Sequence, residues 1–263
     1  MPILILPPRY TEDSIALWEA ATRRNWDTER LQGWRIPEWL SERDVVFYGE
    51  PLLASAVTQS LNVALLEPPF DWLAHLPERH RGRKVEYTTL GHARELREPA
   101  FVKPADDKCF KAAVYDSGDL LPKSGLLADT IPVLIAEPVI WELEVRCFVL
   151  DQHVKTSSPY FRHGQLAQKT DGRWPYLEQE YDQAMAFAGK VLADPEVRIP
   201  PAVVMDVGVI AGHGWAVLEL NSAWGSGLYG CDPNIVLDVI TRACVKKASM
   251  AVEDKAWIVE RQE

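Results

Sequence analysis

A β-hairpin predicted in the last quarter of the chain constrains its fold more than any other stretch. Two β-rich segments, residues 203–210 and 215–221, flank turn-forming chemistry at residues 211–214. Because side chains along a strand alternate between faces, Glu219 and Asn221 point to the same side of the second segment. A strand that only fills a core has no use for two polar neighbours on one face.

Counting across this hairpin brings a second carboxylate to the same face. If Ile210 faces Trp215, then Asp206 stands directly opposite Glu219, and opposed side chains share a face with Cβ atoms about 4.5 to 5.5 Å apart. Two carboxylates and the amide of Asn221 are hard oxygen ligands that suit Mg²⁺. The alternative is an ordinary Asp and Glu on the solvated face of an edge hairpin.

A glycine-rich segment follows the hairpin and favours a site over plain surface. Residues 225–230 contain three glycines, and Asp232 with Pro233 has the chemistry of a helix start. Glycine lets backbone N–H groups approach an anion closely. We therefore expect this turn to bind an anionic group beside the predicted metal ligands.

The composition favours a globular protein without a broad nucleic-acid surface. The 263 residues include 28 Lys and Arg against 38 Asp and Glu, which gives a net charge of −10. No stretch approaches the roughly 20 apolar residues of a membrane helix, and the first residues lack the pattern of a signal peptide. We expect a soluble, cytoplasmic protein with no membrane partner. The oligomeric state is not readable from the sequence.

The first part of the chain alternates strand and helix patterns, which predicts a small α/β unit with parallel strands. Its expected elements are strands at residues 3–6, 45–48 and 63–66 and helices at residues 11–24 and 51–61. We expect two domains, at residues 1–90 and 91–263.

A lysine ends a short apolar strand near residue 101. Lys103 is followed by Pro104, which stops the strand. A lysine in such a position is costly unless its ammonium group finds an anionic partner. Taken alone, this is weak evidence for a functional cation.

A second hairpin is predicted after residue 142. Residues 143–150 alternate cleanly, with Glu144 and Arg146 on one face. Counting across a two-residue turn places Arg146 opposite Ser157 and brings Lys155 to the same face. The simple explanation is an exposed sheet face with cross-strand ion pairs, each worth at most about 1 kcal/mol. A charged functional face is the other.

The order of these features resembles the ATP-grasp superfamily, and more closely a group of short bacterial and phage members, over about residues 83–233. The resemblance implies an α/β protein with the ATP-grasp fold, built of α+β lobes after a small N-terminal α/β domain. It also implies that Lys103 contacts ATP phosphates and that a linker near residues 136–140 joins the lobes. There the backbone from Glu137 to Val139 would contact adenine, and Glu144 would hold the ribose hydroxyls.

The same resemblance assigns the charged residues of both hairpins. Arg146, and with it Lys155 or Arg162, would be aimed at phosphate or acyl phosphate. The Mg²⁺ ligands would be those found by counting along the first hairpin, in the family's Asp then Glu-x-Asn order: Asp206, Glu219 and Asn221.

One segment departs from the family. Many members carry a glycine-rich flap over the phosphates after the strand lysine, whereas residues 105–111 contain no glycine. Lys108 or Lys111 would have to close over ATP by charge instead of by backbone amides.

The resemblance implies an enzyme that uses ATP and Mg²⁺ to join a carboxylate to an amine through an acyl phosphate, releasing ADP and phosphate. Lys103 and Arg146 would be the catalytic cations. The substrate pocket would be formed by the glycine-rich turn and its aromatic neighbours: Trp224, Gly225, Ser226, Gly227 and Tyr229.

The substrates would be small molecules or peptides, and the sequence does not distinguish an amino acid, a peptide or a protein terminus. Nucleic acid is not a favoured partner. Two alternatives stay open. A kinase would use the same residues but release a phosphorylated product, and a non-catalytic module would bind nucleotide without turnover.

Overall fold

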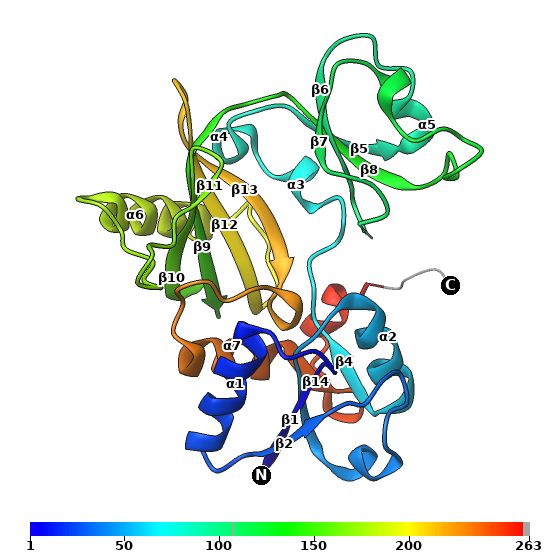
Figure 1. Cartoon of the computed structure of the whole chain (residues 1–263), viewed down its shortest axis with the longest axis vertical. Helices are drawn as coiled ribbons and strands as arrows, with labels where there is room; N and C mark the ends of the chain where they lie inside the picture. The colour runs from blue at the N-terminus through cyan, green and yellow to red at the C-terminus, as the bar shows by residue number, and fades with distance from the viewer. Residues whose placement is uncertain (107, 260–263) are drawn as a thin grey trace.

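The chain is described by a computed structural model that covers residues 1–106 and 108–259. It contains a parallel N-terminal sheet, a small antiparallel sheet and a long antiparallel sheet, arranged around a common centre (Figure 1). The mixed α/β composition agrees with the expected fold class. Within the described part of the chain, no helix has the length and apolar character needed to cross a membrane.

The N-terminal unit is the parallel α/β structure that the sequence predicts. Both outer strands pair parallel to β1, in the order β2-β1-β3. The elements are β1 (Pro2–Leu6), α1 (Glu12–Arg23), β2 (Asp27–Arg30), β3 (Asp44–Phe47), α2 (Pro51–Ser60) and β4 (Val63–Leu65). Thr11 caps α1 in a capping box with Ser14, which fixes where this helix begins.

The small sheet forms a separate lobe at the top of the molecule in Figure 1. Its strands run in the order β5-β8-β6-β7, and Leu90, Val102 and Val133 are at the centre of its own core. The elements are β5 (Val85–Thr89), α5 (Leu90–Ala93), β6 (Ala100–Pro104), β7 (Ala113–Tyr115) and β8 (Pro132–Ala136). The short helices α3 (Trp72–His75) and α4 (Glu78–Arg81) precede it.

The long sheet is the frame of the site and has two different faces. Its order is β11-β10-β9-β12-β13, with every pair antiparallel. The elements are β9 (Trp141–Leu150), β10 (His153–Arg162), β11 (Gln165–Leu166), α6 (Glu180–Leu192), β12 (Ala202–Ile210), β13 (Gly214–Ser222) and α7 (Pro233–Ala243). Helix α6 covers the apolar face, where Val145, Cys147 and Met205 are fully buried. The opposite face is apolar only at the end that packs with α7 and the N-terminal unit, where Phe148 and Val204 lie.

Both predicted hairpins form, and both contain β-bulges that the sequence does not announce. In the β12–β13 hairpin, Val209 rather than Ile210 pairs with Trp215, but Leu218 is bulged and restores the predicted pairing of Asp206 with Glu219. The predicted register is therefore wrong by one at the turn and right at the site.

In the β9–β10 hairpin the predicted turn is correct, since Leu150 pairs with His153. Beyond the turn, however, Lys155 is the bulged residue, so Arg146 pairs with Ser158 and not with Ser157. Lys155 is exposed and is not opposite the strand residue that the count assigned to it. The error has a simple cause, because one bulge shifts every later pair by one residue.

The sheets do not divide at residue 90. Strand β5 ends at Thr89 and pairs with β8 of the small lobe. The C-terminal strand β14 (Cys244–Lys246) returns to the first unit and pairs with β4. The expected linker at residues 137–140 does connect β8 to β9, which belong to different sheets. The division into two domains stays a prediction.

Candidate active site

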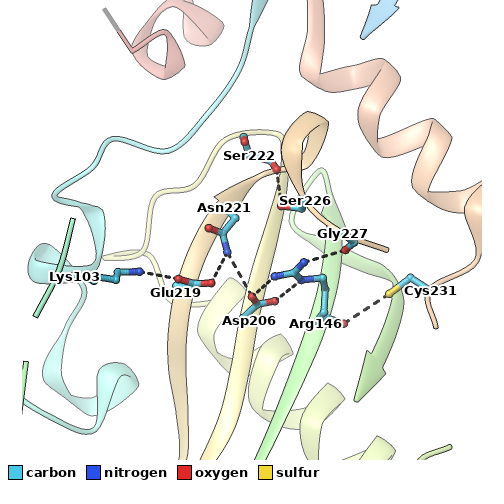
Figure 2. Close-up of polar contacts among 9 residues, drawn as sticks. All are labelled: Lys103, Arg146, Asp206, Glu219, Asn221, Ser222, Ser226, Gly227 and Cys231. Carbon is cyan, nitrogen blue, oxygen red and sulfur yellow. Dashed lines mark hydrogen bonds and ion pairs between the residues drawn. The ribbon is translucent and has the colours of Figure 1, made fainter. Parts of the chain in front are cut away.

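Three charged residues lie in one row across the long sheet. Arg146 on β9 pairs with Asp206 on β12, and Asp206 pairs with Glu219 on β13. Because paired residues of adjacent strands present their side chains on one face, the three head groups converge (Figure 2). Lys103 reaches the row from the end of β6, and Asn221 lies two residues beyond Glu219.

Arg146 and Asp206 form the inner ion pair. Nε donates to Oδ1 at 3.0 Å and Nη2 to Oδ2 at 2.7 Å, and the two residues are 7% and 0% exposed. The guanidinium also donates to the carbonyl of Gly227 at 2.9 Å and lies over the rings of Tyr160 and Tyr229. Burial alone lowers the pKa of Arg146, but Asp206 raises it well above its ordinary value, so the guanidinium stays charged.

Lys103 and Glu219 form the outer ion pair, which joins the small lobe to the long sheet. Lys103 Nζ donates to Glu219 Oε2 at 2.7 Å, and Asn221 Nδ2 donates to Oε1 at 2.9 Å. Burial raises the pKa of Glu219, but Lys103, Asn221 and Arg146 together reverse that effect and hold the pKa at about 2. The lysine predicted to need an anionic partner has one.

The row opens into a cleft of about 860 Å³ between the small lobe, the long sheet and the N-terminal unit. The predicted site residues that line it are Lys103, Arg146, Glu219, Asn221, Gly225, Ser226, Gly227 and Tyr229. The Ser226 hydroxyl donates to the carbonyl of Ser222 at 2.7 Å, which ties the glycine-rich turn to the end of β13. Lys108 and Lys111 also line the cleft, whereas residue 107 of the flap segment lies outside the described residues.

The donor set fits Mg²⁺. Asn221 Nδ2 is 2.9 Å from Glu219 and 3.4 Å from Asp206, so the amide and both carboxylates are within one hydrogen bond of each other. Their negative charge is offset by Arg146 and Lys103 in this structure. Across residues 1–106 and 108–259, no group of three His, Cys, Asp or Glu side chains is placed to hold a metal. A metal here would take two carboxylates and an amide, completed by water and phosphate oxygens.

Two predicted site residues lie elsewhere. Trp224 is 1% exposed, and its indole N–H donates to the carbonyl of Leu66, so it packs in the core and does not shape the substrate pocket. Arg162 is paired with the Glu180 carboxylate and donates to the carbonyl of Pro175 at 3.0 Å. It borders a different hollow, beside β11.

The residues expected at the nucleotide base are not part of the cleft lining either. Glu137 accepts a hydrogen bond from the backbone N–H of Lys84 at 2.7 Å, and Val139 lies in the same connection between the lobes. Glu144 lies on the site face of β9, where burial raises its pKa and a hydrogen bond with Tyr160 opposes this. Contacts of these three residues with a nucleotide stay predictions.

Sequence reasoning missed two groups at the site. Tyr160 lines the cleft and stacks on Tyr229 with ring centroids 4.9 Å apart, but it is itself a bulged residue that alternation could not assign to a face. Asp13 was expected only as a possible helix cap. It instead accepts a hydrogen bond from Tyr48 at 3.4 Å and another from the backbone of Leu228, and burial raises its pKa. Its signal would have been a carboxylate in the first turn of α1, which is too common to single out.

The fold and this site are those of an ATP-grasp protein. A family model described as an ATP-grasp domain, the second family of its clade, matches residues 80–239, and the chain belongs to that family. No curated protein matches the chain.

Solved structures share the fold at low identity. A RimK domain ATP-grasp protein from Sphaerobacter thermophilus is 15% identical, with a TM-score of 0.60 over 91% of this chain and 99% of that one. The D-cycloserine synthetase DcsG is 16% identical, with a TM-score of 0.58 over 91% and 98%. N5-carboxyaminoimidazole synthetase from Staphylococcus aureus is 10% identical, with a TM-score of 0.55 over 92% and 77%. These likenesses cover the N-terminal unit as well as the matched family domain.

Proposed function

We propose that this chain is an ATP- and Mg²⁺-dependent ligase that joins a carboxylate to an amine through an acyl phosphate. The observation that carries the proposal is the convergence of Asp206, Glu219 and Asn221 with two cations, Lys103 and Arg146, at one cleft of an ATP-grasp protein. DcsG and N5-carboxyaminoimidazole synthetase, which share the fold, are named as synthetases.

The proposed reaction solves one chemical problem. A carboxylate is a poor electrophile because its leaving group would be oxide. In the first step a carboxylate oxygen attacks the γ-phosphorus of ATP, and ADP leaves. In the second step the amine attacks the acyl carbon and gives up a proton, the carbon–oxygen bond breaks, and phosphate leaves. The products are ADP, phosphate and an amide.

The described residues have distinct tasks in this scheme. Asp206, Glu219 and Asn221 would hold Mg²⁺, which bridges phosphate oxygens and neutralises their charge when bound. Lys103, at the edge of the small lobe, would exchange Glu219 for a phosphate oxygen. Arg146 is largely buried, so it would act mainly by fixing Asp206 and the Gly227 carbonyl in place.

The acceptor end of the cleft is the glycine-rich turn. Its backbone N–H groups would hold the substrate carboxylate, with Tyr229 as a wall of the pocket. An amino acid, a peptide and a protein terminus each present the required groups. The cytoplasm, where ATP is abundant, is the proposed location.

Calorimetry with Mg·ATP tests the metal and nucleotide assignment. We expect the native chain to bind ATP more tightly with Mg²⁺ than without it, and the double variant Glu219→Ala, Asn221→Ala to lose at least about tenfold of that difference. The matched control is Glu180→Ala, which removes an arginine-paired carboxylate outside the cleft. A native chain that ignores Mg·ATP, or a double variant that keeps the metal dependence, contradicts the proposal.

Hydroxylamine tests the reaction class. It intercepts an acyl phosphate to give a hydroxamate, so carboxylates that support ADP release can be screened without knowing the amine. Hydroxamate formation with stoichiometric phosphate supports a ligase. A stable phosphorylated product formed with ADP, and no hydroxamate, identifies a kinase instead.

A further inference from the structure

Strand β13 changes the face of its side chains partway along. Trp215, Val217 and Leu220 pack against the core under α6, whereas Glu219 and Asn221 face the cleft. In an unbroken strand, Val217 and Glu219 would share a face because they are two residues apart. The bulge at Leu218 is what separates them. Without an extra residue at this point, the predicted metal ligands would follow Val217 into the core.

Arg83 contacts the bulge directly. Its Nη1 donates to the carbonyl of Val217 at 2.9 Å and its Nη2 to the carbonyl of Leu218 at 3.0 Å. Carbonyls of successive strand residues normally point in opposite directions, so one guanidinium can take both only where the ladder is broken. Arg83 is 8% exposed and also donates to the carbonyl of Arg81, so its contacts are made within the protein.

The ring of Trp141 supports Arg83 in this position. The guanidinium carbon lies 5.0 Å from the ring centroid. The ring fits because position 208 is glycine: a Cβ there would be 2.9 Å from the Trp141 ring and 2.4 Å from the carbonyl of Leu143. Gly208, Trp141 and Arg83 thus form a continuous support beneath the bulged part of β13.

We infer that Arg83 is a positioning residue for the metal ligands: it holds the bulge at Leu218 and so decides which face Glu219 and Asn221 present. The inference rests on the proposed function only in taking these two residues as metal ligands. The competing role for a cation at this position is direct contact with a bound nucleotide.

Amide hydrogen exchange without metal judges the positioning role independently of the proposed function. We expect Arg83→Met to raise exchange at residues 217–221, because two carbonyls lose their donor. Arg81→Met is the matched control, since Arg81 donates to the carbonyl of Ala74 and not to β13. Unchanged exchange at residues 217–221 in Arg83→Met overturns the inference, whatever the chain binds.

Metal binding then measures the consequence. With Mn²⁺ as the probe, followed by electron paramagnetic resonance, we expect about a 10- to 100-fold loss of affinity in Arg83→Met and little change in Arg81→Met. Arg83→Lys keeps the charge but not the two-pronged donor, so it should resemble Arg83→Met. Full affinity in Arg83→Lys overturns the positioning role. A native chain that binds no Mn²⁺ contradicts the proposed function and leaves the exchange result to decide this one.

Deleting Leu218 separates positioning from direct contact. The deletion removes the extra residue but keeps both neighbouring pairs, Val207 with Val217 and Asp206 with Glu219. The shortened strand alternates regularly and still presents Glu219 to the cleft. We therefore expect Arg83→Met to have less than about a threefold effect on Mn²⁺ affinity when Leu218 is absent. An equal loss in both backgrounds shows direct contact and overturns the inference.

Discussion

The two ion pairs of the site differ in what surrounds them. Arg146 and Asp206 belong to neighbouring strands, their side chains are 8% and 0% exposed, and two hydrogen bonds join them. Lys103 and Glu219 belong to different sheets, their side chains are 24% and 26% exposed, and one hydrogen bond joins them. A buried, two-pronged pair cannot open without leaving a charge unpaired, whereas a partly solvated single contact can exchange partners. The inner pair is therefore a frame and the outer pair a contact that a substrate can replace.

Removing Arg146 should break the frame. Arg146→Met leaves Asp206 buried without its partner, and we expect a loss of about 3 to 5 kcal/mol in the free energy of unfolding, measured by urea denaturation. Replacing both partners, as in Arg146→Met with Asp206→Leu, should recover more than half of that loss. If the single variant loses less than about 1 kcal/mol, the inner pair is not a frame.

Removing Lys103 should spare the frame and affect the ligand. Lys103→Met loses one charge-assisted hydrogen bond at a partly exposed position, so we expect about 1 to 2 kcal/mol in stability. Nucleotide affinity should fall about 10- to 100-fold by calorimetry, because a phosphate oxygen loses its cation. Lys190→Met on the exposed side of α6 is the matched control. Unchanged affinity in Lys103→Met would show that the outer pair does not exchange partners.

Acid should remove the difference between native protein and Lys103→Met. The pKa of Glu219 is about 2 in the folded protein, against an ordinary value of 4.5. A lowered carboxyl pKa stabilises the fold above pH 4.5, and this contribution is lost as the pH falls toward 2. The stability gap between the two proteins should therefore be largest above about pH 4.5 and shrink below it in urea titrations. A gap that stays constant from about pH 7 to about pH 2.5 contradicts the lysine's hold on Glu219.

Local patterns in the sequence were sufficient for the inner site because it is built on strands. Alternation placed Glu219 and Asn221 together, and the count placed Asp206 opposite Glu219. That count succeeded although it missed the Leu218 bulge, since the assumed turn was wrong by one residue in the compensating direction. In the other hairpin the turn was right, and the bulge at Lys155 made the later count wrong. Bulges depend on tertiary partners such as Arg83, which lies more than a hundred residues away in the chain.

The remaining misses concern side chains whose partners come from distant segments. Nothing near Trp224 in the sequence shows that its indole meets the carbonyl of Leu66. Asp13 reaches the glycine-rich turn only because α1 and α7 pack against each other, which no local pattern contains. The return of β14 to pair with β4 is likewise a long-range event. Fold class and the order of motifs were predictable, whereas the identity of the neighbours was not.

Arg162 gives the smallest expected effect and the most direct check on where the site ends. It is held by Glu180 and the carbonyl of Pro175, in a hollow beside β11 and not in the cleft. Arg162→Met should therefore change Mg·ATP affinity by less than about twofold, while lowering stability by about 1 kcal/mol because it ties β10 to the start of α6. A loss of affinity of about tenfold would mean that Arg162 leaves Glu180 to reach the ligand. It would then be a third exchangeable cation beside Lys103, and the division between frame and exchangeable contact would have to include the segment before α6.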